Sequence, residues 1–265
     1  RVRSVVKTEE TTKLEVVLTR GVIGERQEKV ARKKLLVNSV PRRLFDYLGN
    51  FRAVIFGPQD LGLVTDSPSL RRRFLDSAIS QVDREYARAV LSYEKGLRNR
   101  NRVLLRIRDE GFSRSQLLFW DRLLIKNGDY ISQKREEFIE FVVKSGPIND
   151  QEFSLGYDKS AISEGRLADY AEEEVAAATT LVGPHRDDFV FKIQNSKFKI
   201  QNPRELSRFG SRGEQRMAVL WLKLAELSYI DQKTGSKPTL LLDDIFSELD
   251  HEHRKVVVDM VAKHQ

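Results

Sequence analysis

Hydrophobic and polar residues follow three successive patterns along the chain. The first part alternates β-branched and polar side chains, most clearly over residues 13–20 and 28–37, and closes with the apolar run 52–56. This alternation predicts strands. The second part has helical spacings, and the third mixes strands and helices in a compact α/β block. We place the bounds of the three parts at residues 1–67, 68–180 and 181–265.

The second part is predicted to contain two long helices. Apolar residues recur at intervals of three, four and seven from Phe74 to Leu104, which predicts one long amphipathic helix. A polar, glycine-containing stretch interrupts this pattern, and Ser113 is suited to cap a second helix. The simplest arrangement of the two is an antiparallel hairpin, here called the arm. Gly, Pro and Asn residues over 146–159 end the arm, and a further helix is predicted over 167–180.

The predicted arm carries most of the net charge. The chain has a net charge of +7, and residues 68–145 hold 17 Lys and Arg against 11 Asp and Glu, which is six of those seven charges. Arg98, Arg100 and Arg102 stand in the densest stretch. Such a surface can contact the phosphate backbone of DNA without reading its sequence, and this binding weakens with salt. The alternative interpretation is an ordinary solvated helix face, and charge alone does not choose between the two.

Composition argues against several kinds of site. The chain has no cysteine, which excludes disulfides and cysteine-bound metals and fits a reducing, cytoplasmic setting. No apolar run is long enough to span a membrane, so we expect no membrane partner. The four histidines, His185, His251, His253 and His264, do not resemble a metal cluster.

An apolar strand predicted over 237–242 ends in two carboxylates, Asp243 and Asp244. Ligands of open α/β sheets bind at the carboxyl ends of strands. In that place the first carboxylate can hold Mg²⁺ beside a bound triphosphate, and the second can polarise the attacking water. The alternative interpretation is a buried strand followed by a polar turn with a capping aspartate.

A second candidate phosphate site lies upstream of this strand. Ser211 opens a predicted helix, and the free N–H groups at a helix start attract anions. Ser211 and Glu214 also fit an ordinary capping box. A capping box, however, requires neither Gly210 nor Gly213.

In their order along the chain these stretches resemble the signature, Walker B and D-loop motifs of ABC-type ATPases, and more closely the RecF family. The matching stretches are Val-Ile-Phe-Gly-Pro-Gln-Asp-Leu at 54–61, Ser-Pro-Ser-Leu-Arg-Arg-Arg-Phe-Leu-Asp at 67–76, the Arg-Asn pairs of 93–102, Gly-Pro-His-Arg-Asp-Asp at 183–188, Gly-Ser-Arg-Gly-Glu-Gln-Arg at 210–216, and Leu-Leu-Asp-Asp-Ile-Phe-Ser-Glu-Leu-Asp at 241–250. The resemblance implies an α/β fold, an ABC-type (P-loop, SMC-like) ATPase head with an inserted α-helical hairpin arm. Residues 1–67 would be the remainder of an N-terminal ATPase lobe, and residues 181–265 would carry the signature helix, Walker B and D-loop.

The resemblance also implies roles near the magnesium. Asp243 would hold Mg²⁺, and Asp244 would be the catalytic base of ATP hydrolysis. Ser247 and Asp250 would form the D-loop across a dimer. Gln59 is a candidate Q-loop residue that would sense the metal and nucleotide, although the family usually has glutamate there.

The other carried-over roles concern the signature loop and the family motif. Ser211 and Gly213 would reach the γ-phosphate of ATP held by a second subunit, with Arg212 and Gln215 in support. In the motif at 183–188, His185 and Arg186 would support the nucleotide or the interface between lobes, or would only shape the turn before the next strand.

The function implied by the resemblance is that of an ATP-dependent DNA-binding mediator in DNA replication, repair and the SOS response. ATP would join two heads into a homodimer that grips DNA, and slow hydrolysis to ADP and phosphate would reopen it. The expected DNA is duplex beside a single-strand gap. The expected protein partners are RecR, RecO and RecA, and the dimer would assist recombinase loading.

One departure from the family is important. The sequence contains no Gly-x-x-x-x-Gly-Lys-Ser/Thr loop to cradle a triphosphate. The family has this loop upstream of the position of Arg1 and a final strand beyond Gln265, so we expect both ends to be missing. We therefore predict that this chain alone does not hydrolyse ATP. Two alternatives stay open, namely the ATPase subunit of another SMC-like DNA-processing complex and a non-hydrolysing DNA-binding remnant.

Overall fold

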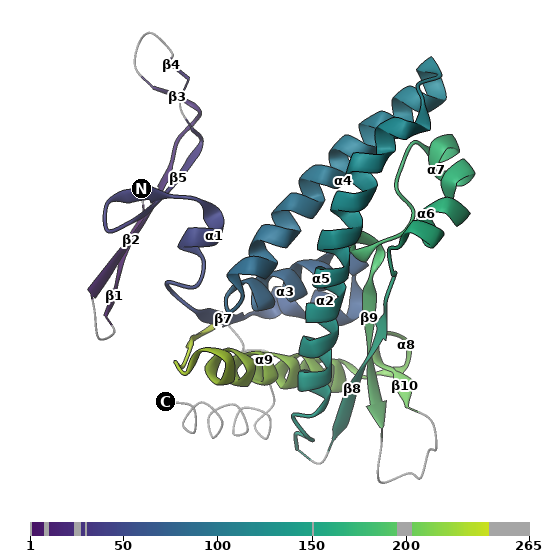
Figure 1. Cartoon of the computed structure of the whole chain (residues 1–265). Helices are drawn as coiled ribbons and strands as arrows, with labels where there is room; N and C mark the ends of the chain where they lie inside the picture. The colour runs from purple at the N-terminus through teal and green to yellow at the C-terminus, as the bar shows by residue number, and fades with distance from the viewer. Residues whose placement is uncertain are drawn as a thin grey trace.

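The computed structural model describes residues 2–7, 11–23, 28–29, 31–149, 151–194 and 203–243. Within these ranges the chain forms an N-terminal sheet, a long helical arm and an α/β body (Figure 1). Asp244, Ser247 and Asp250 lie outside the described residues, so their predicted roles stay predictions.

The N-terminal sheet is antiparallel and has the strand order β1-β2-β5-β6. Leu14 and Leu35 are buried in it. Its strands confirm the predicted strand-rich start, although the strand predicted over 28–37 is two separate strands. The elements of this part are β1 (Val2–Lys7), β2 (Thr11–Leu18), β3 (Val22–Ile23), β4 (Glu28–Lys29), β5 (Lys33–Val37), β6 (Val40–Arg42) and α1 (Leu44–Tyr47).

The arm is a hairpin of α4 (Arg84–Glu110) and α5 (Leu118–Val143). The single helix predicted from Phe74 onward is wrong, because α3 (Pro68–Ser80) ends before α4 begins. Asp83 causes the break, since its carboxylate accepts a hydrogen bond from the Tyr86 N–H (2.8 Å) and caps a new helix. Gly111, with φ of 69°, ends α4. Ser113 caps a short 3₁₀ turn, η2 (Arg114–Leu117), that leads into α5.

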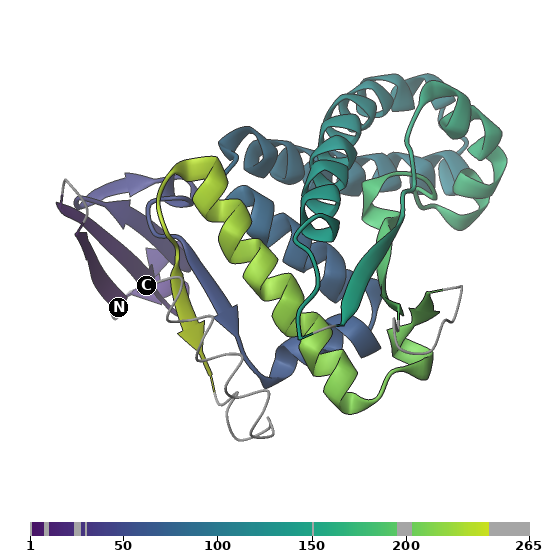
Figure 2. The same ribbon diagram turned by 90° about the horizontal axis from the view of Figure 1, so that it is seen from below.

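The body contains two small sheets and a long helix. Parallel strands β7 (Ala53–Phe56) and β11 (Thr239–Leu242) form one sheet. Helix α9 (Arg212–Thr234) packs on it through Leu227 and Ile230, which meet Val54. The other sheet has the order β10-β9-β8 and lies at the base of the arm. Figure 2 shows α9 crossing the body when the molecule is seen from below.

The second sheet and the short elements differ from the predicted pattern in two places. The stretch 146–159, predicted only to end the arm, contains a strand, and the helix predicted over 167–180 is two short helices. In the part of the chain that the structure describes, no helix is long and apolar enough to cross a membrane. These elements are β8 (Glu152–Asp158), β9 (Asp188–Gln194), β10 (Arg204–Glu205), η1 (Pro58–Leu61), α2 (Gly62–Thr65), α6 (Glu164–Asp169), α7 (Ala171–Ala177), η3 (Pro184–Arg186) and α8 (Leu206–Phe209).

Candidate nucleotide and DNA sites

Two predicted nucleotide-site residues, Gln59 and Asp243, lie at the same sheet edge. Strands β7 and β11 are parallel and in register, with Leu242 opposite Phe56. The Asp243 N–H donates to the Phe56 carbonyl oxygen (2.9 Å), and Gln59 follows Phe56 in the turn η1. Both side chains are exposed. Because the carboxyl ends of parallel strands form ligand sites, this edge is the candidate place for the metal and the phosphates.

Gly57 gives Gln59 room to fold back over the backbone. A β-carbon placed on Gly57 would lie 2.8 Å from Gln59 Nε2 and 2.9 Å from Oε1, so any larger residue would displace the carboxamide. The Gly57 N–H donates to the Asp60 carboxylate (2.9 Å), and the Asp60 N–H donates to the Gly57 carbonyl (3.0 Å). These two reciprocal bonds close the turn that carries Gln59.

The signature loop starts α9 with a complete capping box. The Ser211 N–H donates to Glu214 Oε2 (2.7 Å), and the Glu214 N–H donates to Ser211 Oγ (3.3 Å). A β-carbon on Gly213 would have no atom closer than 4.0 Å. Arg212 and Gly213 stand in the first turn of α9, where backbone N–H groups have no acceptor within the helix. The helix start is therefore capped and still open to an anion.

Gln215 has a different position from the one expected for a phosphate-site residue. Its side chain is buried, and Nε2 donates to the carbonyl oxygens of Leu206 (3.0 Å) and Gly210 (3.3 Å). A β-carbon on Gly210 would lie 2.7 Å from the Leu206 carbonyl oxygen, so only glycine fits. Gln215 and Gly210 thus build the loop, and its exposed members are Ser211 and Arg212.

The signature loop and the sheet edge are far apart in one chain. Helix α9 has 23 residues and is about 34 Å long, whereas the four-residue strand β11 returns only about 13 Å of that distance. The chain turns back at Gly235 between them (Figure 2). Ser211 and Asp243 therefore do not face the same nucleotide within one copy of the chain.

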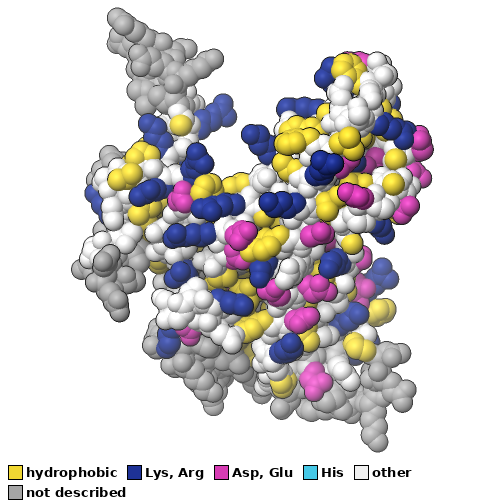
Figure 3. Space-filling model, in the orientation of Figure 1, with side chains coloured by type: hydrophobic (Ala, Val, Ile, Leu, Met, Phe, Trp, Pro, Cys, Tyr) yellow, Lys and Arg dark blue, Asp and Glu magenta, His cyan; other side chains and the backbone are white. Residues whose placement is uncertain are grey.

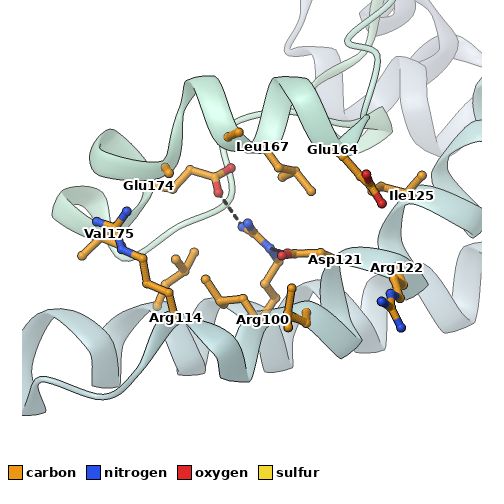
Figure 4. Close-up of a pocket in the computed structure, with 14 residues that line it drawn as sticks. Arg100, Arg114, Asp121, Arg122, Ile125, Glu164, Leu167, Glu174 and Val175 are labelled. Atoms are coloured by element: carbon orange, nitrogen blue, oxygen red, sulfur yellow. Dashed lines mark hydrogen bonds and ion pairs between the residues drawn. The ribbon is translucent and has the colours of Figure 1, made fainter.

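Arg100 is not on the arm surface, so the expectation that it contacts DNA is wrong. It is 2% exposed, and its guanidinium pairs with Asp121 (2.7 Å) and Glu174 (2.7 Å). It also donates to Thr180 Oγ1 (2.9 Å). These contacts join the arm to α7 at the floor of a pocket of about 410 Å³ (Figure 4). An arginine buried between two carboxylates is satisfied internally and has no free face for a phosphate.

Arg98 and Arg102 are exposed on the same helix. The Arg98 side chain is 65% exposed and lies 3.9 Å from Glu94, and Arg102 makes a long hydrogen bond to Asn99 (3.4 Å). Such weak surface contacts leave both side chains available. On the face shown in Figure 3, Lys and Arg side chains gather between the N-terminal sheet and the arm.

In the family motif at 183–188, His185 is held as a neutral, internally bonded side chain. Its Nε2–H donates to the Thr180 carbonyl (3.0 Å), so Nδ1 accepts from the Tyr93 hydroxyl (2.8 Å). Burial lowers the pKa of His185 to about 4. Arg186 also donates to the Thr180 carbonyl (3.2 Å). Both side chains thus tie the turn to the chain just before it.

The two aspartates of the motif join the arm base to β9. Asp187 is fully buried and accepts hydrogen bonds from Arg135 (2.9 Å), the Ser160 N–H (2.7 Å) and the Tyr157 hydroxyl. Asp188 accepts hydrogen bonds from Arg71 Nε (2.6 Å) and Nη2 (2.9 Å). These partners are distant in the chain, so no local pattern indicates them. The contacts of this motif hold the base of the arm against β9.

Comparison with known proteins gives one consistent result. No family model matches the chain. The DNA replication and repair protein RecF of Herpetosiphon aurantiacus is 35% identical, with 95% of this chain and 68% of that protein covered. RecF of Roseiflexus castenholzii is 33% identical, with 98% and 71% covered.

Solved structures agree with these relatives. The recombination mediator protein RecF with ATPγS, in the RecFOR pathway, matches with a TM-score of 0.82 and 30% identity, covering 99% of this chain and 72% of that one. RecF with ATP matches with a TM-score of 0.79 and 31% identity, covering 94% and 67%. The fold is therefore the expected ABC-type ATPase head with an inserted helical arm, and the chain belongs to the RecF family of DNA replication and repair proteins.

Proposed function

We propose that this chain supplies the DNA-binding arm and much of the ATP site of a recombination mediator that acts in DNA repair. Two copies would close around ATP and grip duplex DNA beside a single-strand gap, and slow hydrolysis would release it. The solved relatives are RecF proteins with ATP or ATPγS in the RecFOR pathway. RecR, RecO and RecA are accordingly the proposed protein partners. We retain the predicted division of the chain at residues 67 and 180 as part of this proposal.

The nucleotide-binding part of this proposal rests on the separation of Asp243 and Ser211 within one chain. An exposed carboxylate and carboxamide at the β7–β11 edge, from Asp243 and Gln59, offer the oxygen ligands that Mg²⁺ prefers. The described residues hold no cluster of three or more metal-binding side chains. Mg²⁺ would take further ligands from the phosphates of ATP, as it commonly does in nucleotide sites. The open helix start at Ser211 would meet the γ-phosphate of a second copy.

Asp244, Ser247 and Asp250 keep the roles that the resemblance implies for them. Asp244 would take the proton from the attacking water, and the other two would line the dimer interface. Ser211 and Arg212 would stabilise the transition state without transferring a proton. These groups supply N–H and guanidinium donors where negative charge develops during phosphoryl transfer.

A mixing experiment tests the arrangement across two copies. It uses a polypeptide that carries this sequence together with a Gly-x-x-x-x-Gly-Lys-Ser/Thr loop. We expect Ser211→Arg and Asp243→Asn each to abolish ATP hydrolysis when pure. Mixed, the two variants should regain turnover, because each hybrid dimer contains one site with an intact Asp243 and an intact Ser211. No recovery on mixing, with dimers demonstrated, would place both residues in one subunit's site.

The DNA half rests on exposed cations of the arm. Arg98 and Arg102 are exposed on α4, and Lys and Arg side chains gather between the N-terminal sheet and the arm on the face shown in Figure 3. Contacts of this kind bind the phosphate backbone whatever the sequence, so gap recognition would have to come from the shape of the DNA and from partner proteins.

Salt dependence of binding tests this surface. We expect Arg98→Ala with Arg102→Ala to weaken binding of a gapped duplex and to flatten the slope of log K against log salt by about two. The matched control, Lys144→Ala with Lys159→Ala, removes the same charge from the C-cap of α5 and from the residue after β8, and should leave the slope unchanged. Equal slopes for the two double variants would mean that this face of the arm does not contact DNA.

A further inference from the structure

A buried ion cluster links the turn that carries Gln59 to the signature helix. Lys223 of α9 places its Nζ 3.2 Å from Asp60 Oδ1 and 3.7 Å from Glu226 Oε2. Lys223 is 7% exposed and Glu226 is 4% exposed. The ammonium group also lies 4.9 Å from the centroid of the Phe74 ring, which covers it on another side. The residues of this cluster, here called the α9 cluster, are Asp60, Lys223 and Glu226.

The α9 cluster contains two carboxylates for one cation. Glu226 Oε2 makes no hydrogen bond with any described residue. Burial raises the pKa of Glu226 to about 7, with Asp60 adding to the rise and Lys223 opposing it. Lys223 and Asp60 are the charged groups of the described chain that act on this carboxyl. The cluster therefore changes between neutral and singly negative close to neutral pH.

Asp60 occupies the centre of the connection. One of its carboxylate oxygens meets Lys223, and the other accepts the Gly57 N–H (2.9 Å) that closes the turn. The Gln59 carboxamide lies against Gly57, so a change at Asp60 acts directly beneath it. Lys223 stands 12 positions after Ser211 on one continuous helix, which is about 18 Å of rigid structure.

We propose that Lys223 is a positioning residue that fixes the Gln59 turn to the signature helix through Asp60, and that ionised Glu226 competes for Lys223 and loosens the turn. Lys223 Nζ lies 3.2 Å from Asp60 and 3.7 Å from Glu226, so both carboxyl groups are within its reach. Ionisation adds an attraction toward Glu226 inside a buried site, where charges act strongly on one another. The helix that carries Ser211 would thus sense the state of the Gln59 turn. This inference rests on the proposed function for its use, because that function gives both ends a place at the nucleotide.

Amide hydrogen exchange on the whole chain without nucleotide tests the connection. The reporter is the Gly57 N–H, whose protection factor measures the bond to Asp60. We expect this protection to fall roughly threefold to tenfold as pH rises from about 6 to about 8. In Glu226→Gln, which keeps shape but cannot ionise, protection should stay high and lose its dependence on pH.

A second variant and an internal control separate coupling from general destabilisation. Lys223→Met should lower Gly57 protection at every pH. The amide of buried Phe138 in α5 should be unaffected in both variants. The proposal is overturned if Glu226→Gln keeps the pH dependence of the unmodified chain, or if Phe138 loses protection in parallel with Gly57. Because no nucleotide is present, failure here leaves the ATP proposal standing, and failure of the mixing experiment leaves this result intact.

Discussion

The signature loop and the family motif at 183–188 are both motif-bearing turns, but their polar groups are used in opposite ways. At the signature loop, the first N–H groups of α9 stay open, and Ser211 and Arg212 are exposed. At the family motif, Asp187 is fully buried among Arg135, Tyr157 and Ser160, and His185 has a partner on each ring nitrogen. Motifs that identify a family can thus contain residues exposed for ligand binding and buried residues that hold the fold together. Solvent access and unused donors distinguish the two.

The largest effect should come from removing one partner inside the closed motif. Arg135 is bonded to Asp76, Asp187 and the Pro184 carbonyl, and Arg135→Ala leaves two carboxylates without their cation. We expect the free energy of unfolding to fall by about 3–5 kcal/mol. Urea unfolding followed by circular dichroism measures this. Arg98→Ala serves as the exposed control and should change stability by no more than about 0.5 kcal/mol. Similar losses of unfolding free energy for both variants would show that burial of Arg135 does not set its contribution to stability.

A pair of glycines in the signature loop gives a smaller and sharper contrast. Gly210→Ala forces a β-carbon to within 2.7 Å of the Leu206 carbonyl oxygen, and we expect a loss of about 1–3 kcal/mol. Gly213→Ala meets nothing nearer than 4.0 Å and should leave stability unchanged or slightly higher. Thermal unfolding of the two variants side by side is sufficient. If Gly213→Ala were the more damaging variant, the loop would be packed differently from the described structure.

The pH dependence of stability should reveal the lowered pKa of buried His185. The pKa of His185 is about 4 in the folded chain against an ordinary value of 6.5, so the unfolded chain binds the proton first. Stability should therefore fall with acidification from about pH 6.5 to about pH 4, by at most about 1.4 kcal/mol per pH unit. Glu226 acts in the opposite direction, because its pKa is raised from 4.5 to about 7 and the folded chain binds that proton first.

These two groups mask one another over most of that window, so the experiment needs variants. Glu226→Gln should make the loss on acidification steeper, and adding His185→Gln should flatten it again. Urea unfolding at intervals of pH for both proteins measures the difference. Identical profiles for the single and the double variant would show that His185 is not held neutral.

Much of the fold was predictable from the sequence because its patterns are local. The alternation at 13–20 marks β2, the apolar strand before Asp243 marks β11, and the capping box considered as an alternative at Ser211 is present. The break at Asp83 was missed, since the apolar stripe continues through α3 and α4 while the cap that separates them depends on one carboxylate.

The site was predicted less evenly, and the reason is long-range pairing. Asp243 and Gln59 lie at one sheet edge, and their roles at a nucleotide stay predictions. Arg100 could not be separated from Arg98 and Arg102, because its partners Asp121 and Glu174 come from distant parts of the chain. The roles of Gln215 and Gly210 depend likewise on the backbone of Leu206, which no periodicity indicates.

The close packing of the arm has a mechanical consequence. At Gly96 a β-carbon would lie 2.5 Å from the Leu123 side chain, and at Gly128 one would lie 2.6 Å from Ile162, so neither helix can slide or roll without a collision. The 27 residues of α4 make a lever about 40 Å long. Its fulcrum is the Arg135–Asp187 pair at the base of the arm. A sideways force on the tip would therefore reach the body as torque on β9, which begins directly after Asp187.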